Sequence, residues 1–297
     1  MHKAKLALLI LFALLAILAF GISRLFVAPS DEEYVIAVTF AGMLDELERL
    51  VGKGRVSVVV TIGADPHDVS LTPEGVRTLS RALLIVTMGH THVDHEVEKL
   101  KKTGEIKGVV INIVNLENVS RPVLPDGRIN YHELYCDPYN LKVILEVVAK
   151  ELIRIGAGGE EVQERLRALM RDIDSIVERK VTLEGRKAVI VYAGIQAQIE
   201  WLGLRVIHYL AEEPGSAPLP RALRQASVLL SQEDSVIAVV GIGASGEPLT
   251  DLDEWLLREA ERLGRPVLKV RLCALSTSAL ETIRETAKAA ERLIEES

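Results

Sequence analysis

Cysteine is scarce in this chain of 297 residues, and its scarcity narrows the possible chemistry. The only two cysteines, Cys136 and Cys273, are far apart and form no C-x-x-C pair. This pattern argues against a disulfide framework and against a structural zinc knuckle. We therefore expect two free, buried thiols. The sequence also has no G-x-S-x-G elbow, so a serine hydrolase is not indicated.

Basic residues are also fewer than acidic residues in this chain. The chain has 35 lysines and arginines against 42 acidic residues, which gives a formal net charge of -7. It has no basic stripe, so general attraction to nucleic acid or to anionic lipid is not expected. Hydrophobic residues make up 48% of the chain and charged residues 26%, values typical of globular proteins. The length is sufficient for two domains with cores of their own.

The first 30 residues differ in composition from the rest. Between Lys5 and Arg24 lie uncharged, mostly apolar residues. As a helix this segment would extend roughly 27 Å, close to the thickness of a bilayer's hydrocarbon core. Lysines precede it and acidic residues follow it, so the positive-inside rule places the body of the protein outside. We predict that residues 1–30 contain an uncleaved signal-anchor and a linker, which hold the body at the cell membrane on its extracytoplasmic side. Cleavage near residues 19–21 is the open alternative.

Apolar runs alternate with helical patterns from residue 34 to the end of the chain. Runs rich in valine and isoleucine, without polar alternation, are typical of strands buried on both faces, and so of a mostly parallel sheet under helices. Strands are expected at residues 34–40, 56–62, 82–88, 108–114, 187–193, 205–210, 235–242 and 267–275. Helices are expected at residues 43–51, 73–81, 93–102, 138–153, 196–202, 220–231, 251–263 and 278–295. The fold class is therefore α/β.

A long helix divides this alternation into two sets. Residues 160–181 carry an apolar stripe at helical spacing that is about six turns long. We expect a first α/β lobe at residues 31–158, a spacer helix at residues 159–182 and a second α/β lobe at residues 183–297. Two such lobes would leave a cleft between them.

His67 occupies the most informative position in the chain. It follows the apolar run 56–62, in a loop that Pro66 stiffens. Proline pushes the residue before it towards extended geometry, so His67 would lie at the carboxyl end of a strand. Open α/β sheets bind their ligands at that edge. A metal ligand is the first role to consider for His67, but position alone does not decide it, because most lone histidines are surface residues or satisfied core residues.

Two segments resemble one known family, the metal-binding solute receptors of ABC transporters that take zinc or manganese. Residues 63–89, which include Gly-Ala-Asp-Pro-His-Asp, resemble the first ligand loop of that family and the strand after it. Residues 132–140, His-Glu-Leu-Tyr-Cys-Asp-Pro-Tyr-Asn, resemble its second ligand segment. The resemblance implies a receptor, not an enzyme, that holds a divalent cation between two lobes and delivers it to a membrane permease. It also implies that His67 and His132 are ligands, and neutral imidazoles suit zinc and similar cations.

The second lobe departs from the family pattern. Tyr192 stands where the resemblance implies a third histidine, and we expect it to pack or to donate a hydrogen bond. The late strand that would end in an aspartate reads Arg-Leu-Cys-Ala-Leu at 271–275. Cys273 could therefore supply a thiolate to a softer ion. Our hypothesis is instead that His90 or His92 completes the coordination in the first lobe. A receptor of the same fold for a non-metal ligand is another alternative.

The run that contains these histidines also permits an enzymatic interpretation. His90-x-His92-x-Asp94-His95 fits the dinuclear metal motif of metallo-β-lactamase-like hydrolases, in which a bridging hydroxide attacks an ester, amide or phosphodiester. That fold begins with a run of hairpin strands, whereas this chain alternates strands and helices. We therefore favour the receptor.

Three weaker patterns are not expected to carry function. Residues 241–246 have the glycine spacing of a dinucleotide loop but no acidic partner at the expected strand end. Glu212 and Glu213 precede a Pro-Gly pair, which predicts a solvated turn. His208 lies within an expected strand.

Overall fold

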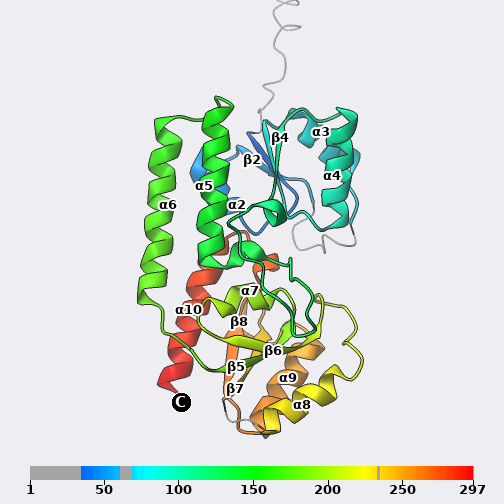
Figure 1. Cartoon of the computed structure of the whole chain (residues 1–297), viewed down its shortest axis with the longest axis vertical. Helices are drawn as coiled ribbons and strands as arrows, with labels where there is room; N and C mark the ends of the chain where they lie inside the picture. Colours follow the sequence, from blue (N-terminus) through cyan, green and yellow to red (C-terminus); the bar gives the residue numbers. More distant parts are fainter. Residues whose placement is uncertain (1–34, 61–68, 233–234, 297) are drawn as a thin grey trace, which may run out of the picture. The chain divides into compact units, whose positions relative to one another are not determined.

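Two four-stranded parallel sheets form the frame of the described part of the chain (Figure 1). The computed structural model describes residues 35–60, 69–232 and 235–296. The first sheet has the order β2-β1-β3-β4 and consists of β1 (Ile36–Val38), β2 (Val56–Val58), β3 (Leu84–Thr87) and β4 (Val109–Asn112). The second has the order β6-β5-β7-β8 and consists of β5 (Lys187–Tyr192), β6 (Arg205–Ala211), β7 (Val236–Gly241) and β8 (Val267–Val270). The predicted α/β class with parallel sheets is confirmed.

Helices flank both sheets, close to the predicted positions. Those that accompany the first sheet are α2 (Leu44–Val51), α3 (Pro73–Arg81) and α4 (His92–Thr103). Those that accompany the second are α7 (Ile195–Glu200), α8 (Ala222–Gln232), α9 (Asp251–Arg262) and α10 (Ala279–Glu295). Between the sheets the chain forms α5 (Pro138–Arg154) and α6 (Glu160–Arg179). Short 3-10 turns are η1 (Ile113–Asn115), η2 (Leu134–Cys136) and η3 (Cys273–Leu275). We call the first sheet and the chain up to the end of α5 the first lobe, and the chain from β5 to α10 the second lobe.

The same helix start occurs after β3 in the first lobe and after β7 in the second. Thr91 caps α4, and its hydroxyl accepts a hydrogen bond from the backbone of Asp94, whose carboxylate binds back to the cap. Thr250 and Asp253 repeat this capping box at α9. Each carboxylate also accepts a hydrogen bond from the glycine near the end of the preceding strand. The two boxes therefore fix the loops at the carboxyl ends of the two sheets.

The predicted spacer helix is present as α6. Its 20 residues correspond to a length of about 30 Å. Figure 1 shows α6 beside α5 at the first lobe and running down towards the second lobe. Among the described residues, one cluster of buried apolar side chains extends from β1 through α5 and α6 to β5 and β7. The lobes thus share an apolar core, and the lobe boundaries at residues 158 and 182 stay a prediction.

A disulfide joins the two lobes, so the expectation of two free thiols was wrong. Cys136 in η2 and Cys273 in η3 are bonded, with their Cα atoms 6.4 Å apart. The strand expected at residues 267–275 ends at Val270, and the chain then turns away into η3. The pairing was not predicted from the sequence because 137 residues separate the two cysteines.

The predicted signal-anchor in residues 1–30 lies outside the described residues. Among the helices that the structure describes, none combines the length and the apolar character needed to cross a bilayer.

Candidate metal site

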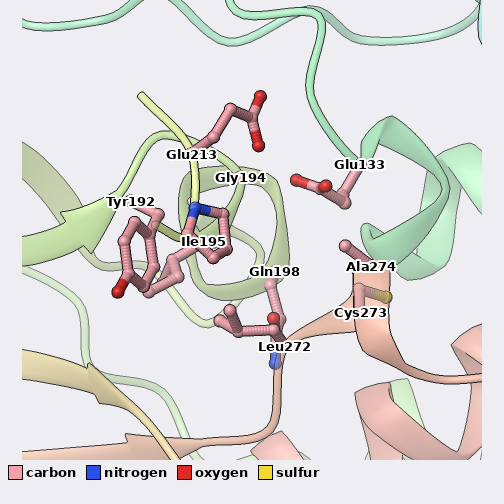
Figure 2. A pocket seen from close by; sticks show the side chains of 10 residues that line it. Glu133, Tyr192, Gly194, Ile195, Gln198, Glu213, Leu272, Cys273 and Ala274 are labelled. Atoms are coloured by element: carbon pink, nitrogen blue, oxygen red, sulfur yellow. The ribbon is translucent and has the colours of Figure 1, made fainter. Parts of the chain in front are cut away.

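The loops at the carboxyl ends of the second sheet meet a first-lobe segment at a small cavity. Loops that follow β5, β6 and β8 line it, together with Glu133 of the first lobe. Its volume is about 10 Å³, roughly the room that one water molecule needs. Figure 2 shows the carboxylates of Glu133 and Glu213, one from each lobe, pointing into the space between them.

His132 lies at this meeting of the lobes. Its Nε2 is 2.6 Å from Oε1 of Glu213, and both side chains are less than one fifth exposed. Its Nδ1 is 2.8 Å from Oδ1 of Asn130. Burial of the ring lowers the pKa of His132, but the hydrogen bond to Glu213 and the negative charge there outweigh burial, so the pKa lies above its ordinary value.

Asn130 connects His132 to the second lobe. Its Nδ2 donates to the backbone oxygen of Ala193 at 2.8 Å and to Oε1 of Gln196 at 3.0 Å. Its Oδ1 also accepts a hydrogen bond from the backbone N–H of His132 at 3.0 Å. Asn130 therefore fixes both the backbone and the ring of His132 relative to the second lobe.

His90 lies beside His132. The ring centroids are 5.1 Å apart, and the rings meet edge to face. His90 belongs to the turn after β3, where the backbone N–H groups of Gly89 and His90 donate to Oδ2 of Asp94 at 2.7 and 3.1 Å. The structure thus brings together two of the predicted ligands, from segments about 40 residues apart in the sequence.

Asp94 and His92 do not join these imidazoles. Oδ1 of Asp94 accepts a hydrogen bond from the hydroxyl of Thr39 at 2.6 Å, and its Oδ2 is used by the turn after β3. The side chain of His92 is 56% exposed on α4, with its Nε2 3.8 Å from Glu96. His95 is exposed as well. The structural role of Asp94 and the parallel sheets both argue against the dinuclear hydrolase.

Replacing Asp94 by alanine is expected to lower the free energy of unfolding by about 2 kcal/mol, because the cap and the buried hydrogen bonds to Thr39 and the turn are lost. Urea denaturation of both proteins measures the difference. His95→Ala, on the exposed side of the same helix, is the matched control and should change stability by less than about 0.5 kcal/mol. Equal losses in the two variants would contradict the role assigned to Asp94.

The two residues that depart from the family pattern, Tyr192 and Cys273, make other contacts. The hydroxyl of Tyr192 donates to Oδ2 of Asp253 at 2.9 Å and also contacts the hydroxyl of Thr250. The expectation that Tyr192 serves in hydrogen bonding is confirmed. The sulfur of Cys273 is bonded to Cys136 in the disulfide, so it is not available as a thiolate ligand. His208 lies within β6, as expected, and its Nε2 bonds to the backbone oxygen of Ala222 at 2.9 Å.

The turn after β6 is not the solvated turn that was expected. Arg128, in a first-lobe loop, donates to Oε1 of Glu212 at 2.5 Å and to Asp126. The hydroxyl of Tyr209 donates to Asp126 at 2.8 Å. The hydrogen bond from Arg128 lowers the pKa of Asp126 to about 2. This network, which joins the lobes, holds the turn that presents Glu213 to His132.

Glu133 was not recognised as a candidate from the sequence, although it follows His132 directly. Its backbone has a φ of 40°, a left-handed conformation that is uncommon for a residue other than glycine. The carboxylate lies where a side chain at position 194 would be, so only glycine at that position leaves room for it. The sequence gives no local sign that residues 133 and 194 would meet.

The described residues alone do not form a complete metal site. Within the described ranges, no group of three histidine, cysteine, aspartate or glutamate side chains is arranged to hold a metal ion. His67 falls in the stretch 61–68, outside the described residues. The groups that do meet are imidazoles and carboxylates, which are donors that suit zinc and similar divalent cations.

Two parallel α/β sheets, a long helix between them and polar groups that meet where the lobes join define the class of two-lobed periplasmic binding receptors. The family model described as ZnuA, the periplasmic component A of a zinc-uptake complex, matches residues 36–242. The chain therefore belongs to this family of periplasmic metal-binding proteins, and the family predicted from the two ligand segments is confirmed.

Solved structures show the same fold. A structure of ZnuA superposes with a TM-score of 0.64 at 18% sequence identity, over 87% of this chain and 97% of that one. The periplasmic metal-binding protein from Candidatus Liberibacter asiaticus gives a TM-score of 0.67 at 16% identity, over 87% of this chain and 98% of that one. The latter protein has also been solved in manganese-bound and cadmium-bound forms. Among the curated proteins, no match was found.

Proposed function

We propose that this protein is an extracytoplasmic receptor that captures a divalent metal ion, zinc or manganese, between its lobes and delivers it to an ABC permease. The observation that carries the proposal is the meeting of His90 and His132 at the boundary between the lobes. Membership of a zinc-uptake family supports it. The manganese-bound and cadmium-bound forms of a structural neighbour support a divalent cargo. In this proposal, residues 1–30 anchor the receptor at the membrane.

We assign the cation to His67, His132 and His90. The first two are implied by the family's ligand segments, and His90 supplies a third imidazole beside His132. A set dominated by imidazole favours zinc over manganese, which prefers oxygen donors. The exposed His92 receives no ligand role. The shared apolar core and the disulfide allow only small movements between the lobes when the ion enters.

The size of the cavity supports an ion rather than an organic solute. About 10 Å³ of space at the lobe boundary is far below the several hundred Å³ of typical small-molecule sites. A receptor of the same fold for a non-metal ligand would need a much larger opening here. The family members are binding proteins, so we propose that this chain has no catalytic activity.

Removing the His132 imidazole is expected to weaken zinc binding by at least about a hundredfold, or roughly 2.7 kcal/mol. The measurement is isothermal titration of zinc into the metal-stripped full-length protein and into His132→Ala. His92→Ala is the matched control, because it removes an imidazole from the same lobe at an exposed position. It should stay within about twofold of the wild type. Equal zinc affinity of His132→Ala and wild type would refute the proposed site.

A further inference from the structure

We propose that Glu213 is the metal ligand contributed by the second lobe, and that it forms with His132 a ligand pair across the lobe boundary. This inference rests on the proposed metal-binding function and adds to it the residue by which the second lobe takes part.

The second lobe needs another donor because its two expected positions are unavailable. The hydroxyl of Tyr192 is held by Asp253 and Thr250. The sulfur of Cys273 is bonded to Cys136. Neither side chain can turn towards the imidazoles of the first lobe without breaking a buried contact.

The geometry around His132 favours Glu213. A metal-binding histidine commonly donates its other ring N–H to an oxygen acceptor, which fixes the orientation of the ring. Oδ1 of Asn130, 2.8 Å from Nδ1, is such an acceptor. Nε2 is then the nitrogen that faces the metal, and it lies 2.6 Å from Oε1 of Glu213.

Only a small movement would admit an ion between these two atoms. In a tetrahedral zinc site, nitrogen and oxygen ligands lie about 2.0 to 2.2 Å from the metal, which separates the two donor atoms by roughly 3.3 Å. Nε2 and Oε1 would therefore have to move apart by somewhat less than about 1 Å. A change of rotamer at Glu213 can supply such a shift without opening the lobes.

The turn that carries Glu213 is built to hold it in place. The hydroxyl of Ser216 donates to the backbone oxygen of Glu213 at 2.6 Å, and the backbone N–H of Ser216 donates to the same oxygen at 3.2 Å. The neighbouring Glu212 is bound by Arg128 of the first lobe at 2.5 Å. The ion pair of Glu212 thus holds the turn against the first lobe, one residue before Glu213.

The charge of the site also fits a divalent cation. Glu133 and Glu213 line the same cavity from opposite lobes. Two carboxylates balance the double charge of the ion, which reduces the cost of placing it away from water. Because Gly194 has no side chain, it leaves the space that the Glu133 carboxylate occupies.

Glu213→Gln tests the ligand pair, because the amide keeps the size of the side chain and removes its charge. Zinc is titrated calorimetrically into the metal-stripped full chain of the wild type, of Glu213→Gln and of Glu213→Ala. We expect affinity to fall at least tenfold in Glu213→Gln and further in Glu213→Ala. Glu247→Gln, which removes an exposed charge from the same lobe, is the control and should match the wild type. Thermal melts without metal show whether each variant is folded.

The possible outcomes separate the two proposals. Unchanged or tighter binding in Glu213→Gln, with binding lost in His132→Ala, would overturn the ligand role of Glu213 and leave the receptor standing. Tighter binding would mean that Glu213 competes with the metal for His132. A wild type that binds neither zinc nor manganese, the latter titrated in the same way, would overturn the proposed function, and the ligand pair with it.

Discussion

Replacing Cys136 and Cys273 by serine is expected to lower the free energy of unfolding by about 3 to 5 kcal/mol. The disulfide closes a segment of 137 residues, and such a crosslink removes much of the freedom of the unfolded chain. Both cysteines are buried, so the serines would also place hydroxyl groups in an apolar environment. Urea denaturation of the oxidised wild type and of the double variant measures the difference.

The reduced wild type provides the control for this prediction. With a reductant present, its unfolding midpoint should approach that of the double variant, and the variant itself should not respond to the reductant. Coinciding midpoints of oxidised wild type and variant would show that the disulfide contributes little.

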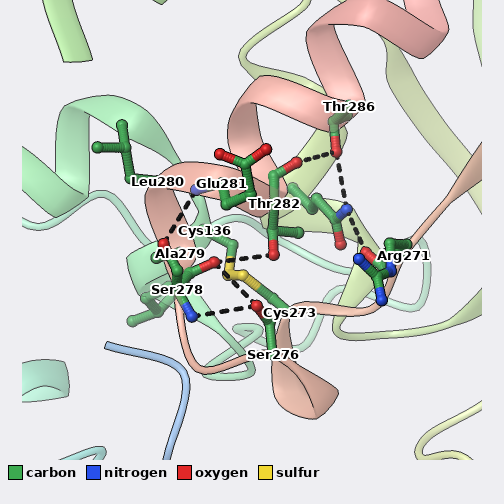
Figure 3. Close-up of a disulfide and its surroundings, with 12 residues drawn as sticks. Cys136, Arg271, Cys273, Ser276, Ser278, Ala279, Leu280, Glu281, Thr282 and Thr286 are labelled. Atoms are coloured by element: carbon green, nitrogen blue, oxygen red, sulfur yellow. Dashed lines mark hydrogen bonds between the residues drawn. A yellow bond between two sulfur atoms is a disulfide. The ribbon is translucent and has the colours of Figure 1, made fainter. Parts of the chain in front are cut away.

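The disulfide also has a functional consequence because of where it lies. Cys136 is four residues after His132, and Cys273 lines the cavity with Glu133. Figure 3 shows the bond beside the first residues of α10, near Ser278 and Ala279. It therefore ties the first-lobe ligand segment directly to the second lobe. Such bonds persist in extracytoplasmic compartments, in agreement with the family.

Glu46→Ala is expected to lower the free energy of unfolding by about 3 kcal/mol, the second large effect. Glu46 lies on α2 in the first lobe and is 1% exposed. Its carboxylate accepts hydrogen bonds from the hydroxyl of Ser278 at 2.6 Å and from the backbone N–H groups of Leu280 at 3.1 Å and Ala279 at 3.3 Å. It thus caps the first turn of α10 in the other lobe. Alanine at position 46 would leave these donors buried without the carboxylate that accepts their hydrogen bonds.

Glu46→Gln separates the loss of hydrogen bonds from the loss of charge. Ser278 and Leu280 both donate to the same oxygen of Glu46, so a glutamine oxygen at that place keeps two of the three bonds. We expect a loss of about 1 kcal/mol by denaturant titration. A glutamine variant as unstable as the alanine variant would mean that the charge, rather than the hydrogen bonds, joins the lobes.

The pH dependence of stability follows from the same residue. Burial raises the pKa of Glu46 above its ordinary value of 4.5, although the hydrogen bonds from Ser278 and the α10 backbone act in the opposite direction. A carboxyl group with a raised pKa in the folded state stabilises that state most when protonated. Its contribution is therefore full below pH 4.5 and falls as the pH rises through the folded-state pKa. The stability advantage of the wild type over Glu46→Gln should shrink in that window. A constant difference would contradict the raised pKa of Glu46.

The sequence predicted those parts of the fold that depend on local patterns. Valine-rich runs identified the strands of both sheets because a strand buried on both faces has no polar alternation. Asp137 before Pro138 correctly predicted the start of α5, where the carboxylate accepts bonds from the first backbone N–H groups. The ligand segments gave the family for the same reason, since each is a short contiguous stretch.

Contacts between the lobes could not be predicted, because they depend on how distant elements pack. Glu213 resembles any acidic residue before a Pro-Gly turn, and only the packed structure brings it to His132. The same holds for Glu46, whose partners at the start of α10 are more than 230 residues away. The disulfide escaped prediction for this reason too, since neither cysteine has a local partner.

The most direct test of the account is the position of zinc in crystals of the full chain grown from metal-stripped protein and then loaded with zinc. Anomalous scattering at the zinc absorption edge locates the ion independently of any assumed ligand. We predict a strong peak at the lobe boundary, about 2.0 to 2.1 Å from Nε2 of His132. Zinc found only at exposed positions such as His92, with no peak beside His132, would contradict the account.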